Sequence, residues 1–182
     1  MRTFVALDLP LNIKVDVSGV INNLRSLCQF GVNWVPQENL HITFQFIGDT
    51  KEEDLPEIAE FLGTSFSGLP KLLFTNPKLE ILPGRDPKII WIGLENNESL
   101  IQKISKRLKN ELRKMGYKID SRRLRFHITL GRIKKRLPEN TVEQILTTEL
   151  KINSFEVSKV TLYQSLLKSQ GPRYIEIINF KF

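Results

Sequence analysis

Hydrophobic residues recur with two different periods along the chain, and segments of the two kinds alternate. A period of three to four predicts amphipathic helices over residues 11–30 and 97–115, each followed by a glycine, at positions 31 and 116. Residues 51–66 and 138–146 predict two further helices, the first opened by Thr50 and Glu53 at the spacing of a capping box. Alternating or β-rich runs predict strands over residues 3–9, 41–47, 72–82, 88–94, 126–133, 155–163 and 174–180, with a turn at 83–87.

The order strand, helix, strand, helix occurs twice, which favours an α+β protein built from two related halves. The chain contains neither a G-x-G-x-x-G nor a G-x-x-x-x-G-K-[ST] pattern, so a parallel nucleotide-binding sheet is disfavoured. A length of 182 residues suits one domain, or two small lobes that share a core. We therefore expect a single domain over residues 1–182.

The composition excludes several classes of protein. With 41% hydrophobic and 26% charged residues, the chain is typical of a globular protein and not of a disordered one. Its apolar runs are far shorter than the ~20 residues of a membrane helix, and the first of them is too short for a signal peptide. The single cysteine, Cys28, excludes an internal disulfide and a multi-cysteine metal site, and its place on the apolar face of a helix argues against a nucleophilic role. We expect a cytoplasmic monomer without a cofactor or a membrane contact.

The net charge of +7 is concentrated in one segment. Thirteen Lys and Arg residues lie between positions 105 and 136, opposed by only two acidic residues, so this segment carries +11 and the rest of the chain −4. A basic segment in a mildly acidic protein indicates a polyanionic partner, either nucleic acid or a phosphorylated ligand. The alternative is a solvated helix face and loop with no partner.

The two histidines of the chain lie in matching contexts, each at the start of a predicted strand. His41 is followed two residues later by Thr43, and His127 by Thr129. Residues two apart share one face of a strand, so each motif presents an imidazole and a hydroxyl on one side. The same alternation would put Gln45 on the histidine face and Phe46 on the apolar one.

A pair of imidazoles suits proton transfer, because histidine titrates near pH ~6.5 and both protonation states are accessible near neutrality. A neutral imidazole can take a proton from water while an imidazolium gives one to a leaving oxygen. The two hydroxyls can donate hydrogen bonds to phosphoryl oxygens, where charge builds in the transition state. Two plain strand residues and a zinc site are the alternatives, but the third and fourth metal ligands are missing from both motifs. A phosphodiester whose hydrolysis needs no metal fits best.

At these residues the sequence resembles the two-histidine phosphoesterase superfamily, and within it the RNA 2′,3′-cyclic phosphodiesterases, also called 2′-5′ RNA ligase-like proteins. The similarity extends over nearly the whole chain. The matching segments are residues 2–10 (RTFVALDLP), 39–44 (NLHITF) with 46–48 (FIG), 89–93 (IIWIG), 127–130 (HITL) with Arg132, 162–165 (LYQS) and 171–174 (GPRY). The chain departs from the family in one respect, since Phe126 stands where a proline usually precedes the second histidine.

The resemblance implies a bilobal α+β fold, in which two antiparallel sheets face a central cleft and are related by a pseudo-twofold axis. It also implies hydrolysis of an RNA 2′,3′-cyclic phosphate to a 2′-phosphomonoester, with His41 as the proton donor and His127 as the proton acceptor. Thr43, Thr129 and Arg132 are then expected to bind the substrate. Arg132 follows His127 by five residues, so strict alternation directs it away from the cleft unless the strand bulges.

Three functions compete at this point. The first is metal-independent hydrolysis of RNA 2′,3′-cyclic phosphate ends, with an RNA or a small cyclic nucleotide as the substrate. The second is a catalytically weak RNA- or nucleotide-binding module, and the third is 2′-5′ RNA ligation by the reverse reaction. The intact double motif favours an enzyme over a binding module, and the excess of water favours hydrolysis over ligation.

Overall fold

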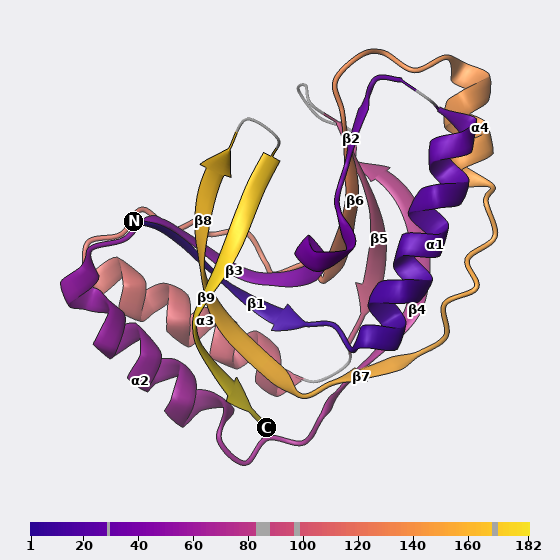
Figure 1. Cartoon of the computed structure of the whole chain (residues 1–182). Helices are drawn as coiled ribbons and strands as arrows, with labels where there is room; N and C mark the ends of the chain where they lie inside the picture. Colours follow the sequence, from indigo (N-terminus) through magenta and orange to yellow (C-terminus); the bar gives the residue numbers. More distant parts are fainter. Residues whose placement is uncertain (29, 83–87, 97–98, 169–170) are drawn as a thin grey trace.

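The computed structural model describes residues 1–28, 30–82, 88–96, 99–168 and 171–182, and it has the expected α+β architecture (Figure 1). Within that part of the chain, two antiparallel sheets meet at one pair of residues, Ile42 and Ile128, and together hold nine strands, eight in the continuous order β7-β4-β5-β6-β3-β1-β8-β9 and β2 beside β6. The first sheet contains β1 (Arg2–Asp8), β3 (His41–Asp49), β8 (Lys159–Lys168) and β9 (Gly171–Lys181). The second contains β2 (Val32–Trp34), β4 (Leu72–Leu82), β5 (Ile89–Glu95), β6 (His127–Ile133) and β7 (Phe155–Val157).

The helices exchange between the two halves. α1 (Leu11–Leu27) follows the first strand of the first half but packs with α4 (Glu139–Leu146) on the second sheet, whereas α3 (Ser99–Lys114) packs with α2 (Leu55–Phe66) on the first (Figure 1). Two 3₁₀ turns, η1 (Gln37–Asn39) and η2 (Glu52–Asp54), precede β3 and α2. None of the helices in the described ranges is long and apolar enough to cross a membrane.

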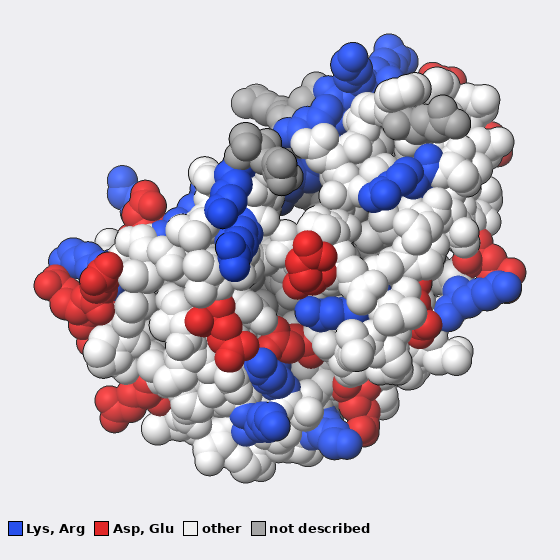
Figure 2. Space-filling view, in the orientation of Figure 1, with Lys and Arg blue, Asp and Glu red and all other residues white. Residues whose placement is uncertain are grey.

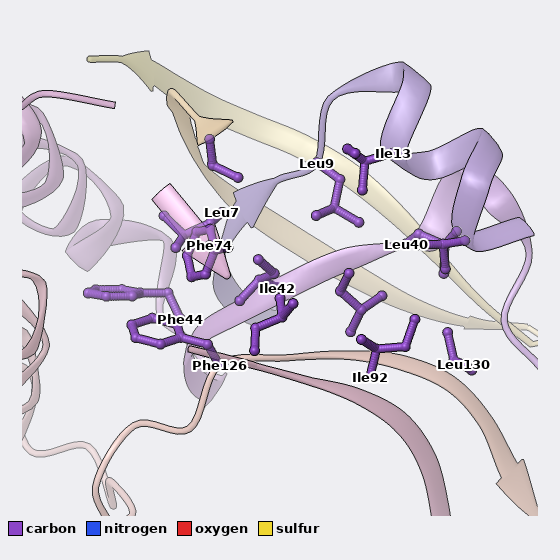
Figure 3. Packing of buried hydrophobic residues seen from close by; sticks show 14 of the residues in the cluster. Leu7, Leu9, Ile13, Leu40, Ile42, Phe44, Phe74, Ile92, Phe126 and Leu130 are labelled. Carbon is purple, nitrogen blue, oxygen red and sulfur yellow. The ribbon is translucent and has the colours of Figure 1, made fainter. Parts of the chain in front are cut away.

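One hydrophobic core extends under the junction of the two sheets. Ile42 and Ile128 are completely buried where β3 and β6 meet. Figure 3 shows Ile42 among apolar side chains of β1, β3, β4, β5, β6 and α1. Since the apolar faces of both histidine strands point into this core, their other faces point toward the solvent on the concave side of the molecule.

Most of the predicted elements are confirmed, with three differences. β2 was not predicted, because three residues are too short to show a period. The capping box was wrong: α2 begins only at Leu55 without a side-chain cap, and the Thr50 hydroxyl instead donates to the carbonyl of Gly48 at 3.1 Å. The strand predicted over 155–163 is two strands, β7 and β8, which belong to different sheets. The turn predicted at 83–87 lies outside the described residues.

Candidate active site

The two histidine motifs lie side by side at the junction of the sheets. β3 and β6 are antiparallel, and their bridging pair joins Ile42 to Ile128. This register places His41 across from Thr129, and Thr43 across from His127, on the face opposite the two buried isoleucines. The structure thus gathers both motifs into one pseudo-twofold cluster, as the resemblance implied.

Both imidazoles are held in the same orientation by backbone carbonyls two residues earlier. His41 Nδ1 lies 2.7 Å from the Asn39 carbonyl oxygen, and His127 Nδ1 lies 2.8 Å from that of Arg125. A carbonyl only accepts, so each Nδ1 carries the proton and each neutral ring presents the lone pair of Nε2. The Thr43 hydroxyl donates to His41 Nε2 at 3.0 Å. Each Nε2 is therefore the atom available for proton transfer.

His127 has an additional support. Its ring packs on Trp91 with the centroids 4.2 Å apart, and the Trp91 indole N–H donates to Glu80 at 2.8 Å. The Arg125 guanidinium also lies over the Trp91 ring, 5.1 Å from its centroid. Phe126, which replaces the usual proline, is buried against Phe74 and leaves the backbone of this motif in the same pattern as that of the first.

A bulge at the same place in each motif changes the predicted alternation. In β3 the pairing with β1 skips Phe44, and in β6 the pairing with β5 skips Leu130, so both bulges occur three residues after the histidine. The prediction that Gln45 shares the histidine face was wrong, because the extra residue turns it into the core, where it is 6% exposed.

The two bulges bring the fifth residue after each histidine onto the cleft face. Phe46 is 63% exposed and lines the cleft, whereas strict alternation placed it with the apolar residues. Arg132 is exposed and lines the same cleft, because β6 has the bulge without which alternation would direct this residue away from it. Hence positions that are equivalent in the two halves hold an aromatic side chain, Phe46, in one half and a guanidinium, Arg132, in the other.

The cleft has a volume of about 720 Å³. His41, Thr43 and Thr129 form part of its floor, and Trp34, Phe46 and Tyr174 contribute three aromatic side chains. Trp34 comes from β2 and Tyr174 from β9, so neither could be assigned to the site without the strand pairing. The part of the chain that the structure describes holds no group of three His, Cys, Asp or Glu side chains placed to bind a metal ion.

The two histidines differ in the charges around them, since only His41 has a carboxylate that raises its pKa. Burial lowers the pKa of His41 to about 4, against the hydrogen bond to Asn39 and the negative charge of Asp8, which raise it, and the positive charges of His127 and Lys14 lower it further. Burial also lowers the pKa of His127, and here the positive charges of Arg125 and Arg132 lower it further. Asp8 thus favours the protonated form of His41, and the two guanidinium groups favour the neutral form of His127, although burial disfavours the charged form of both.

Asp8 belongs to a buried network beside His41. It is the cross-strand neighbour of His41 in the pairing of β1 with β3, and its side chain is 12% exposed. Its carboxylate accepts hydrogen bonds from the Thr161 hydroxyl at 2.5 Å and the Tyr163 hydroxyl at 2.7 Å, and it pairs with Lys159 at 3.4 Å. Sequence reasoning missed this residue, since only the register between two strands shows that it faces a histidine.

Comparison with known proteins agrees with this geometry. The chain is 32% identical to the RNA 2′,3′-cyclic phosphodiesterase of Thermotoga maritima over 100% of its length and 96% of the relative's, and 31% identical to the protein of that name from Archaeoglobus fulgidus over 100% of both. The fold is similar to that of TT0787 from Thermus thermophilus, with a TM-score of 0.83, 21% identity and coverage of 100% and 97% of the two chains.

The structure of Escherichia coli LigT complexed with 3′-AMP is also similar, with a TM-score of 0.73, 22% identity and coverage of 99% and 97% of the two chains. The sequence model of the 2′-5′ RNA ligase superfamily matches residues 13–168, a range that contains both histidine motifs. On the strength of this match and of the full-length relatives, the chain belongs to the 2′-5′ RNA ligase superfamily.

Proposed function

We propose that this chain hydrolyses RNA 2′,3′-cyclic phosphate ends to 2′-phosphomonoesters without a metal ion. The observation that carries the proposal is the pairing of the motifs: two histidines present Nε2 on one face, each across from the other motif's threonine. Relatives similar over the full length are named for this activity. Two proton-transfer groups on one face suit a displacement at phosphorus in which one oxygen enters as another leaves.

The reaction needs two proton transfers. His127 Nε2 takes a proton from water as the water oxygen bonds to phosphorus, while the bond from phosphorus to the 3′ oxygen breaks. Protonated His41 gives its Nε2 proton to that 3′ oxygen, which leaves as a hydroxyl. The phosphate remains on the 2′ oxygen, and exchange with solvent restores both histidines.

The charges around the histidines support this order of roles. A donor must be protonated before the reaction, and His41 is the histidine with a buried carboxylate, Asp8, beside it. An acceptor must be neutral, and His127 lies near two guanidinium groups. The low pKa of free His41 opposes its role as donor, but the negative charge of a bound cyclic phosphate would raise it.

The remaining side chains of the cleft bind the substrate in this proposal. The Thr129 hydroxyl donates a hydrogen bond to a non-bridging phosphoryl oxygen, and so does the Thr43 hydroxyl, which is released from His41 Nε2 when that nitrogen is protonated. Arg132 acts on the same phosphate through its charge, which also acts on His127 and Tyr174. Phe46 offers an exposed ring for the terminal base, because every base can stack on an aromatic side chain.

The test is incubation of the protein with an RNA that ends in a 2′,3′-cyclic phosphate, in excess EDTA, with identification of the product. We expect a 2′-phosphate at an undiminished rate. His41→Ala and His127→Ala should each lose roughly 10²–10⁴-fold in turnover, since each removes one proton-transfer partner. The double variant should be little worse than the worse single variant, because the pair acts as a unit.

Other outcomes identify the competing functions. Binding of the RNA without turnover would make the cleft a binding module. Loss of activity in EDTA would refute the metal-free mechanism. Joining of a cyclic phosphate end to a 5′ hydroxyl faster than its hydrolysis would favour ligation, which proceeds through the same two histidines in reverse.

A further inference from the structure

Four cations line the cleft whose floor includes His41, Thr43 and Thr129, and they come from three stretches of the chain. They are Arg25 near the end of α1, Arg132 on β6, Lys134 just beyond β6 and Lys168 at the end of β8. The lining of this cleft includes neither Asp nor Glu among the described residues. Figure 2 shows Lys and Arg groups on both sides of the hollow between the β8–β9 hairpin and β2.

These cations have no acidic partner in the described part of the chain. The salt bridges found there involve none of the four, whereas Arg122 pairs with Asp120 at 2.5 Å and Lys159 with Glu176 at 2.9 Å. All four are exposed, so solvent and salt screen their mutual repulsion and they can remain together without a counter-charge. Like charges that converge on one cleft without counter-charges raise the local concentration of anions and favour an anionic ligand.

The reacting phosphate accounts for one of the four. Arg132 lies five residues from His127 and acts on its charge, so it belongs to the site already described. Arg25, Lys134 and Lys168 remain, and they line the same cleft from α1, from the residues after β6 and from the end of β8. A single cyclic phosphate carries one negative charge and cannot use all of them.

We infer that Arg25, Lys134 and Lys168 form a phosphate-binding path for the strand that leads into the cyclic end, so that the substrate is a single-stranded oligonucleotide and not a mononucleotide. This inference rests on the proposed function and specifies its substrate class. Three aromatic side chains, Trp34, Phe46 and Tyr174, line the same cleft. A positively charged groove that also carries aromatic rings is the arrangement that binds unpaired nucleotides, whose bases are free to stack.

The path uses only part of the basic segment noted in the sequence. Of the thirteen cations between positions 105 and 136, only Arg132 and Lys134 line this cleft, and the path depends as much on Arg25 and Lys168, which lie far away in the sequence. Lys103, Lys106 and Lys118 are exposed and do not line it, so they serve as matched controls.

The experiment compares two substrates, a mononucleotide 2′,3′-cyclic phosphate and a single-stranded pentanucleotide with the same end, at 50 and 200 mM salt. Three phosphate contacts on a single strand give a salt slope of about −2, so the wild-type KM for the pentanucleotide should rise roughly 20-fold over this range. The KM for the mononucleotide should change much less. The triple variant Arg25→Gln, Lys134→Gln and Lys168→Gln should lose most of the salt dependence and roughly 10–100-fold in kcat/KM on the pentanucleotide only.

The control variant Lys103→Gln, Lys106→Gln and Lys118→Gln should retain wild-type behaviour on both substrates. Equal losses of the cleft variant on both substrates, or no loss on either, would overturn the path. Wild-type protein that turns over neither substrate would refute the proposed function instead. The path is then tested by binding of a labelled pentanucleotide with a 3′-phosphate end, which the cleft variant should bind at least tenfold more weakly than the control variant. Equal binding of a polyglutamate peptide would overturn RNA as the ligand.

Discussion

Replacing Asp8 by Asn removes one negative charge beside His41 with little change of shape. The carboxylate is 12% exposed, accepts hydrogen bonds from Thr161 and Tyr163, and is the cross-strand neighbour of His41. Directly opposed residues place their Cβ atoms about 5 Å apart. The variant therefore tests whether the charge of Asp8 keeps His41 available as a proton donor.

The size of the effect follows from Coulomb's law. Two unit charges about 6 Å apart interact by about 3 kcal/mol at an effective dielectric constant of about 20. Lys159 lies 3.4 Å from the carboxylate and offsets part of this interaction, so about 1–2 kcal/mol of attraction between Asp8 and protonated His41 remains. The pKa of His41 falls accordingly, and kcat/KM at pH 7 should drop roughly 5–30-fold. The loss should shrink as the pH approaches the His41 pKa of about 4, because His41 of the wild type then begins to saturate with protons while that of the variant still gains them.

The assay is the pH dependence of kcat/KM between pH 4 and 9, with Tyr163→Phe as the control. The control removes one hydrogen bond to Asp8 but keeps its charge, so it should lose about 1–2 kcal/mol of unfolding free energy and keep the wild-type pH profile. Asp8→Asn should lose stability as well and shift the profile. If both variants lost the same activity at every pH, Asp8 would be a structural residue only.

Four further predictions follow from named contacts. Thr43→Val and Thr129→Val should lower kcat more than they raise KM, since their hydrogen bonds strengthen as charge builds on the phosphoryl oxygens; unchanged kcat would reduce them to packing residues. Phe46→Ala should raise the KM of a purine cyclic phosphate and change kcat less, because it removes about 1–3 kcal/mol of stacking free energy, whereas Phe46→Tyr keeps the ring and should leave KM unchanged. Gly131→Ala should destabilise the fold by about 1–3 kcal/mol, measured by urea unfolding, because the new Cβ would lie 2.7 Å from a side chain of β2. Because burial lowers the pKa of His41 to about 4, below its unfolded value of 6.5, the wild type should lose stability as the pH falls from about 6.5 to 4, and His41→Gln should lose less.

The sequence was sufficient for the class of fold and for the two motifs. Helices of 16 and 17 residues show their period clearly. The two identical H-I-T segments contain every histidine of the chain, and this repetition predicts that they form one site. Their meeting at the Ile42–Ile128 pair agrees with the implied pseudo-twofold. The roles of the individual residues remain predictions that the variants above test.

The sequence was insufficient where one extra residue changes a strand. Alternation assigns Phe46 and Arg132 to the buried face, and a bulge three residues after each histidine reverses both assignments. A weak signal exists: Phe46 is followed by a second apolar residue, and Gly131 permits the close approach of β2. Neither signal locates the bulge, because pairing with a neighbouring strand decides which residue is skipped.

Residues that act from a distance in the sequence were equally hidden. Asp8 lies 33 positions before His41, and their proximity depends on the register of β1 with β3. The cations of the cleft come from three stretches of the chain, of which only one stands out as basic. Local composition therefore located a charged segment but not the surface on which charges converge.

The duplicated halves supply matching chemistry, so a substrate needs something else to choose its direction across the pseudo-twofold axis. The two HxT motifs are equivalent, and so are their tautomers, since each Nδ1 donates to the carbonyl two residues before it. The positions five residues after the histidines differ, with Phe46 in one half and Arg132 in the other. The same halves differ in charge, with Asp8 beside His41 and two guanidinium groups beside His127. In the proposed reaction, the aromatic ring and the carboxylate of one half and the cations of the other orient a nucleotide and its protons together, so the departures from symmetry set its direction.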